Sequence, residues 1–232
     1  MMRRLREEDG MTLMEVLVAA TVGFVVLAAT MGLLESSVRL NTGVMAKTDA
    51  MQRGRLAMDK ITQQLRSEVC LDLDTPAIAT GATDSSVTFY SDFSSADGTT
   101  LPEKRVLSLS GGMIDSKIYR TSTAGVYPTA PTLASHILEN ALLQKDGAGK
   151  DLPFLTYYAY QTVGDPPHPE ATQILTTPLD KASAARVARI EIRFAALPTG
   201  DKATSTRGLN LTDQIVARHA DPNLSVPDPA CI

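Results

Sequence analysis

One acidic side chain, Glu15, lies inside the most apolar stretch of the chain. The stretch runs from Met11 to Leu34 and contains no other ionisable side chain. A carboxylate in a membrane interior costs on the order of 3 kcal/mol and is by default a candidate for function. It requires a cationic partner if it stays ionised. Glu15 is therefore the first residue for which the sequence demands a chemical explanation.

The apolar stretch itself has the length of a membrane span. Its 24 residues would reach about 36 Å as a helix, and a hydrocarbon core is about 30 Å thick. Arg3, Arg4 and Arg6 precede it, which predicts a cytoplasmic N-terminus and an extracytoplasmic remainder. A secretory signal peptide cut near residues 18–20 (VAA), or a plain membrane anchor, would each leave Glu15 without a task.

The segment from Gly10 to Glu15, GMTLME, resembles the processing motif of type IV pilin precursors. In that family a membrane aspartyl peptidase cuts after the glycine on the cytoplasmic side and methylates the new N-terminus. The resemblance implies that Met11 begins the mature chain and that Glu15 is its fifth residue. Glycine suits the cut because a residue without a side chain can lie extended in a protease cleft. The acidic residues 7–9 (EED) depart from the more basic leaders of the family.

The same resemblance implies a role for Glu15 in assembly. In the family this glutamate is thought to pair with the N-terminal amine of a neighbouring subunit and so to set the axial register of the filament. The amine that cleavage would create at Met11 is cationic, which supplies the partner that a carboxylate in lipid needs.

Beyond the apolar stretch the pattern becomes amphipathic, with no proline before residue 76. One helix is therefore predicted from Met11 to about Leu71. Gly43 and Gly54 lower helix propensity and predict bends in it. An apolar stripe over about three heptads predicts a face packed on a sheet rather than a coiled coil. The stripe consists of Val44, Met51, Met58, Ile61 and Leu65.

The rest of the chain has short β-like runs separated by Thr, Ser, Gly and Pro. Residues 105–110 and 113–119 flank Gly111-Gly112, which predicts a hairpin. Residues 187–194 alternate, so Ile190, Ile192 and Phe194 are predicted to face a core. The alternating residues Arg189, Glu191 and Arg193 are predicted to face solvent. The runs 87–90 and 154–160 are further strand candidates.

The predicted fold class is α+β: a long N-terminal helix packed on an antiparallel β-sheet domain, as in type IV pilins. Its helix has a membrane half and an amphipathic half. The predicted divisions are a leader (1–10), a transmembrane and filament-core helix (11–35), an amphipathic continuation (36–71) and an extracytoplasmic β-rich domain (72–232).

Two cysteines lie far apart, Cys70 near the predicted helix end and Cys231 next to the last residue. In an oxidising extracytoplasmic compartment they would be able to form one disulfide. A bridge would fasten a C-terminal segment that otherwise frays. The alternative is two unrelated thiols, and the sequence alone leaves both open.

Catalytic and metal-binding motifs are absent from the sequence, so we expect neither an enzyme nor a cofactor. His136, His168 and His219 have no ligand spacing around them. A nucleic-acid partner is also not expected, because the net charge is −4 and aspartates interrupt the basic residues of the helix. Those basic residues are Arg53, Arg55, Lys60 and Arg66.

Residues 52–66 (QRGRLAMDKITQQLR) and 212–218 (TDQIVAR) resemble PilW minor pilins and the J-type pseudopilins of type II secretion. The resemblance implies a structural subunit that helps to initiate or cap a type IV pilus or a secretion pseudopilus. The alternatives are a DNA-contacting competence pilin and a membrane-anchored extracytoplasmic enzyme.

The implied partners are the prepilin peptidase and methylase, other pilins or pseudopilins, the inner-membrane assembly platform and membrane lipid. The implied location is a single-pass membrane protein that reaches a filament or the cell surface after assembly.

Overall fold

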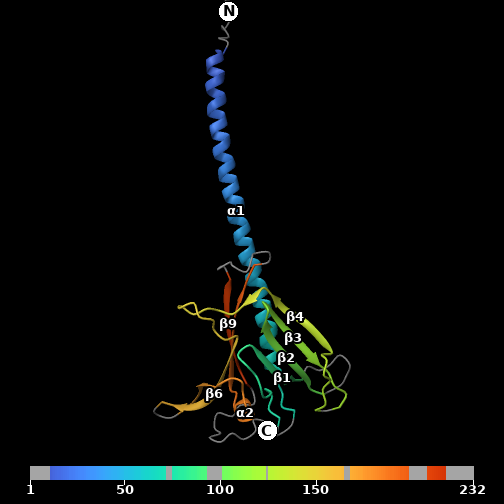
Figure 1. Ribbon diagram of the computed structural model, residues 1–232. Coiled ribbons are helices and arrows are strands. Elements are labelled where there is room, and N and C mark those ends of the chain that lie inside the picture. The colour runs from blue at the N-terminus through green and yellow to red at the C-terminus, as the bar shows by residue number, and fades with distance from the viewer. Residues whose placement is uncertain are drawn as a thin grey trace, which may run out of the picture. The chain divides into compact units, whose positions relative to one another are not determined.

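The computed structural model describes residues 11–71, 75–92, 101–123, 125–164, 168–198 and 208–217. Gly10, His219 and Cys231 lie outside these ranges. The chain divides into two compact units, Met1–Ala46 and Lys47–Ile232. One helix, α1 (Leu13–Arg66, 54 residues), contributes to both units, and every described strand belongs to the second (Figure 1). The division of the chain into leader, membrane and amphipathic segments stays a prediction.

Helix α1 ends at Arg66, before the predicted Leu71, because the backbone that follows joins a sheet. The N–H of Val69 donates to the carbonyl of Tyr90 at 2.9 Å. The N–H of Asp92 donates to the carbonyl of Ser67 at 3.2 Å. These backbone groups are satisfied by a strand, so no glycine or proline is needed to stop the helix.

The first sheet is a simple antiparallel meander in the order β1-β2-β3-β4. Its strands are β1 (Ser86–Ser91), β2 (Glu103–Ser110), β3 (Met113–Tyr119) and β4 (Leu133–Glu139). The predicted hairpin is confirmed: Ser110 pairs with Met113 across Gly111 and Gly112, whose φ angles are 58° and 80°. Positive φ at both central residues is the requirement of a type I′ turn, and glycine meets it without strain.

The second sheet is also antiparallel and has β8 at its centre. Strands β5 and β6 pair along one edge of β8 and β9 pairs along the other, while β7 pairs with β6 at the border of the sheet. Short helix α2 (Lys181–Ala185) precedes β8 and is capped by Asp180, which accepts from the N–H of Ser183 at 2.7 Å. The strands are β5 (Ala141–Leu142), β6 (Leu155–Val163), β7 (His168–Ile174), β8 (Arg189–Ala196) and β9 (Leu209–Val216).

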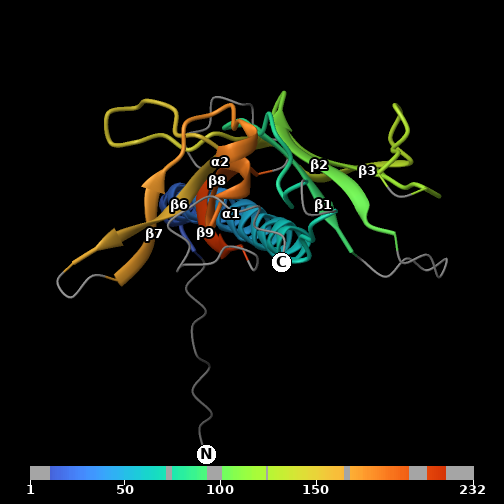
Figure 2. The same ribbon diagram turned by 90° about the horizontal axis from the view of Figure 1, so that it is seen from below.

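Within the second unit, α1 lies between the two sheets, as the view along the helix shows (Figure 2). Met58, Ile61 and Leu65 from the predicted stripe are buried in one core with side chains of both sheets. Val44, at the start of the stripe, belongs to the first unit and is 62% exposed. The predicted fold class, a long helix packed on antiparallel sheet, is confirmed. The sheet-facing partners in the core include Phe89, Leu107, Ile190, Ile192 and Phe194.

Gly54 lies inside the continuous helix α1 at a point of close approach to the second sheet, and the bend expected there stays a prediction. A Cβ atom built at Gly54 would overlap Cδ1 of Leu211 on β9 and lie 3.0 Å from Cβ of Ala196 on β8. Ala50 and Ala57, on the same side of the helix, are also buried. The glycine is therefore a spacer in the packing, which sequence propensity cannot reveal.

Glu191 is a second departure, since it is only 7% exposed although it alternates with the core residues of β8. Tyr158 Oη donates to Glu191 Oε2 at 2.6 Å, and Arg193 Nη2 lies 2.5 Å from the same oxygen. The guanidinium of Arg189 lies 3.9 Å from the centre of the Tyr158 ring. Neighbouring long side chains, not a further layer of apolar residues, thus cover the carboxylate. Burial raises the pKa of the Tyr158 phenol, and its hydrogen bond to Glu191 reinforces the rise.

Strands β4 and β7 were not predicted, because most of their residues are exposed and show no alternation. His168 is the first residue of β7. Pro169 follows it within the strand and is tolerated because β7 lies at the border of the sheet, where an N–H toward solvent is not required.

The close approach at Gly54 predicts that a side chain there is destabilising. We expect Gly54→Val to cost about 2 kcal/mol by overpacking and to lower the thermal midpoint of the detergent-purified chain by about 6 °C. Gly43→Val makes the same change of residue type where a Cβ meets no neighbouring atom, and we expect no loss. Thermal unfolding is followed by circular dichroism at the helix band. Equal midpoints for the two variants would contradict this account of the packing.

Candidate functional site

The first turn of α1 is held by Thr12, whose side chain caps the helix. The N–H of Glu15 donates to Thr12 Oγ1 at 3.3 Å and to the Thr12 carbonyl at 3.0 Å. The N–H of Val16 donates to the same carbonyl at 3.2 Å. Thr12 and Glu15 have the spacing of a capping box, a signal that the sequence analysis did not use. Glu15 therefore sits in the first turn, where the helix dipole favours a negative charge.

Glu15 is exposed and has no ion-pair partner among the described residues. Met11, the residue expected to carry the new amine, is exposed as well. The Thr12 cap and the helix dipole stabilise the Glu15 carboxylate in the first turn of the helix. They do not neutralise its charge in an apolar medium. Its expected pairing with an amine of another subunit is not tested by a single chain.

The apolar side chains that follow Glu15 are exposed all around the helix. Within the described residues, α1 is the one helix long and apolar enough to cross a membrane, with a mean hydropathy of 2.3 in its most apolar 18-residue window. None of that window is buried within the protein. A helix that is apolar on every side needs an apolar environment on every side. The exposed side chains include Val18, Val22, Phe24, Val25, Leu27, Met31 and Leu34.

The outward face of α1 in the second unit is polar, with the exception of Leu56, which is 69% exposed. Arg53, one of the basic residues considered for phosphate contact, is engaged internally. Its Nε lies 2.9 Å from Asp49 Oδ2, and its Nη2 donates to the carbonyl of Leu197 at 3.0 Å. Arg55 and Lys60 are exposed beside Asp59, as expected for a solvated face.

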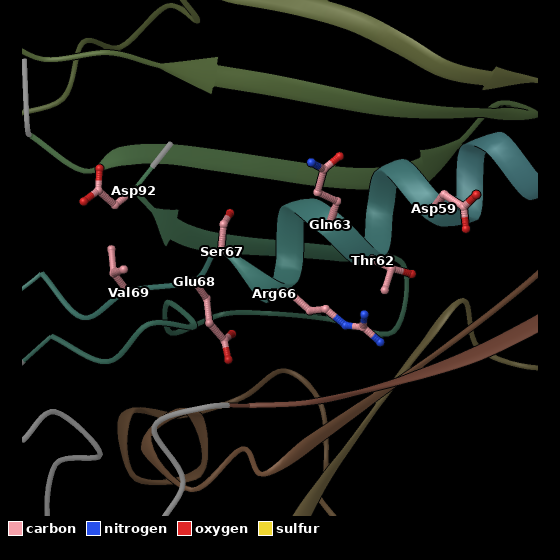
Figure 3. A pocket seen from close by; sticks show the side chains of 8 residues that line it. All are labelled: Asp59, Thr62, Gln63, Arg66, Ser67, Glu68, Val69 and Asp92. Atoms are coloured by element: carbon pink, nitrogen blue, oxygen red, sulfur yellow. The ribbon is translucent and has the colours of Figure 1, made fainter. Parts of the chain in front are cut away.

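A groove of about 610 Å³ lies where α1 ends (Figure 3). Figure 3 shows that its walls come from the last turns of the helix, from the segment that follows and from the end of β1. Three carboxylates and one guanidinium line it, so it lacks the apolar walls of most small-molecule sites. The sequence analysis missed it because Asp92 comes next to Ser67 only through strand pairing. The lining residues are Asp59, Thr62, Gln63, Arg66, Ser67, Glu68, Val69 and Asp92.

Cys70 directly follows the groove residue Val69 and is partly buried. Its proposed partner, Cys231, lies outside the described residues, so the pairing stays a prediction.

The two described histidines each lie beside one carboxylate. His136 Nδ1 is 2.6 Å from Asp115 Oδ1 across β3 and β4, and His168 Nε2 is 3.0 Å from Glu170 Oε1 on β7. Both pairs are largely exposed. In the part of the chain that the structure describes, no three His, Cys, Asp or Glu side chains gather in a way that would hold a metal ion.

Comparison with known proteins gives distant structural likenesses alone. No family model matches the chain, and no curated protein matches it. It is similar to a chain in the crystal structure of the GspK–GspI–GspJ complex from the type 2 secretion system of enterotoxigenic Escherichia coli. The likeness covers 73% of this chain and 96% of that one. With 11% sequence identity and a TM-score of 0.39, it identifies neither a family nor a function.

Proposed function

We propose that this protein is a structural subunit of a type IV pilin-like filament, anchored in a membrane by the first half of α1 before it assembles. The observation that carries the proposal is the placement of GMTLME at the head of a helix that is exposed and apolar from Leu13 to Leu34. The same helix continues into the core between two antiparallel sheets. Leader motif, anchor and sheet-bearing domain thus follow one another as in a pilin precursor.

The exposed apolar surface explains why such a subunit needs two successive environments. Apolar area in water is unfavourable by about 25 cal/mol per Å², and the chain offers nothing in the described residues to cover residues 13–34. Lipid covers this surface while the subunit is in the membrane. The equivalent helices of other subunits cover it in a filament, which makes other pilins or pseudopilins the main partners.

Within this class we propose a minor pilin or pseudopilin that helps to initiate or cap a pilus or a secretion pseudopilus. Residues 52–66 and 212–218 support this narrower proposal through their resemblance to PilW and J-type subunits. A prepilin peptidase and an inner-membrane assembly platform would then act on the chain. Its N-terminus would be cytoplasmic and its sheets extracytoplasmic.

The leader motif predicts cleavage between Gly10 and Met11. Mass spectrometry of the protein taken from its native membrane should find Met11 as the N-terminal residue, carrying one methyl group. A chain that begins at Met1, or one cut near residue 20 as a secreted protein would be, contradicts the proposal. Gly10→Val serves as the control, since a branched side chain at the cut should block processing and leave the leader attached.

Glu15→Ala should separate processing from assembly. The change removes the carboxylate that would pair with a neighbour's amine and leaves the Gly10–Met11 bond intact. We expect normal cleavage and membrane retention, and loss of the subunit from sheared filaments. Glu35→Ala is the matched control, because Glu35 is an exposed carboxylate on the same helix that pairs with Arg39 of its own chain at 2.5 Å. Incorporation of Glu15→Ala at the level of the control would refute the pairing role.

We further propose a disulfide between Cys70 and Cys231, as a fastening for the C-terminal segment. Closing a loop of this length would contribute about 5 kcal/mol at most by the chain-entropy model. Mapping of non-reduced and reduced peptides from protein isolated without reductant should recover the two cysteines in one linked peptide pair. Two thiols that both react with an alkylating reagent before reduction would show that no bridge exists.

A further inference from the structure

The outer face of the first sheet carries a row of aromatic and cationic side chains. Tyr90 on β1, Lys104 on β2 and Tyr119 on β3 are direct cross-strand partners. Their chain neighbours Phe89 and Ile118 are buried on the opposite side of the sheet, where Phe89 joins the core around α1. Side chains alternate along a strand, so the row points away from the helix and is half-exposed.

Two more residues extend the row into a surface, here called the tyrosine–lysine face. The ring of Tyr127 lies 5.6 Å from that of Tyr90, and its Oη donates to the carbonyl of Pro102 at 2.8 Å. Lys117 lies on the same side of β3 as Tyr119, and its side chain is exposed. The face therefore consists of Tyr90, Lys104, Lys117, Tyr119 and Tyr127, which are separated in sequence by up to 37 positions.

Contacts within the protein hold the rings in place before any ligand binds. Lys104 Nζ lies 5.2 Å from the centre of the Tyr119 ring, a cation–π arrangement. The hydrogen bond from Tyr127 to the backbone fixes the outer end of the Tyr90–Tyr127 pair. Burial, with a smaller contribution from Tyr90, raises the pKa of Tyr127 to about 12, so its phenol remains a donor at any physiological pH.

The face is cationic although the chain as a whole is acidic. The carboxylate of Glu103 precedes Lys104 but points to the opposite side of β2, where it is 4% exposed and bound by Arg105 and Arg120. Asp115, two residues before Lys117, is engaged with His136. Within the described residues neither lysine has an ion-pair partner, so their charges are offered to a ligand.

We propose that the tyrosine–lysine face binds single-stranded nucleic acid, with bases stacked on the tyrosine rings and phosphates on the two lysines. Stacking platforms flanked by cations are the usual way in which proteins bind unpaired strands without reading their sequence. A four-stranded sheet face is wider than the helix or two-stranded ribbon that the major groove of a duplex admits. The face also offers a sugar polymer few acceptors for its hydroxyl groups, because lysine has none. The proposal does not depend on the filament role.

From the sequence, no nucleic-acid partner was expected, because the net charge is −4 and aspartates interrupt the basic residues of the helix. Neither reason concerns the local charge of the first sheet. The lysines of this face come from two strands and the tyrosines from two strands and a loop, and only the register of the first sheet brings them together.

The charge part of the proposal is tested with the full chain in detergent micelles and a fluorescent oligothymidylate of about 16 nucleotides, the upper end of known site sizes. Binding is followed by anisotropy over a range of salt concentrations. Lys104→Gln combined with Lys117→Gln should reduce the slope of log affinity against log salt by about 1.4. The control, Arg55→Gln with Lys60→Gln, removes the same charge from the exposed face of α1 and should leave affinity and slope unchanged. Equal effects of the two pairs, or no binding by the wild-type chain, would overturn the proposal.

The stacking part is tested with Tyr119→Leu, which should weaken binding about tenfold, and with Tyr119→Phe, which keeps the ring and should bind as the wild type does. Tyr160→Leu on β6 is the control for loss of a half-buried tyrosine elsewhere. Competition by polyphosphate tests stacking even if the Leu variant fails to fold. Wild-type binding by Tyr119→Leu, or competition by polyphosphate as effective as that by the oligonucleotide, would show a charge-only surface and refute the proposal. Loss of binding in Tyr119→Phe would show that the hydroxyl group, not the ring, is needed, and would also refute it. Binding of an anionic polysaccharide in place of the oligonucleotide would also refute it.

Discussion

The structure depends on the apolar surface of one helix, α1. This helix is apolar on all sides in its first half and on one side only in its second half. In the second unit the buried side of α1, from Ala50 to Leu65, is covered by both sheets. In the first unit the side chains from Leu13 to Leu34 are exposed. Burial of apolar area is the dominant favourable term in folding, and none of the described residues buries this first half. The proposed anchoring in lipid and the proposed assembly with other subunits would each cover it.

Each sheet packs its inner face against the helix and carries polar side chains on its outer face. Their inner faces supply Phe89, Leu107, Ile190 and Phe194 to the core around the helix. Their outer faces carry polar networks: Tyr158, Glu191 and Arg193 on the second sheet, and the tyrosine–lysine face on the first. The charge of Glu191 is paired within the chain, whereas Lys104 and Lys117 have no ion-pair partner among the described residues. A filament subunit of the kind proposed would be held by its helix and would still present polar side chains on its strands.

Much of the fold could be predicted from local sequence patterns. The Gly111-Gly112 turn could be predicted because both positions need a positive φ, and the β8 core residues because they alternate. Gly54 could not be predicted as a spacer, since its reason lies in Leu211, far away in sequence. Glu191 was misplaced because alternation assigns a face but does not say whether long neighbouring side chains cover it. The groove at the end of α1 depends on the pairing of Asp92 with Ser67, and the tyrosine–lysine face depends on the register of β1 against β2. No two-residue turn joins either pair of segments, so the sequence does not set their pairing directly.

The claim that the first half of α1 is solvated by lipid can be measured with one fluorophore, because the natural chain contains no tryptophan. Phe24→Trp places a single indole near the middle of the apolar stretch, and Val44→Trp places one beyond it. In vesicles of brominated lipids, emission from Phe24→Trp should be blue-shifted and quenched most strongly by bromines near the bilayer centre. Emission from Val44→Trp should be red-shifted and insensitive to them. Equal quenching of the two variants, or a Phe24→Trp emission that responds to aqueous quenchers alone, would contradict the account.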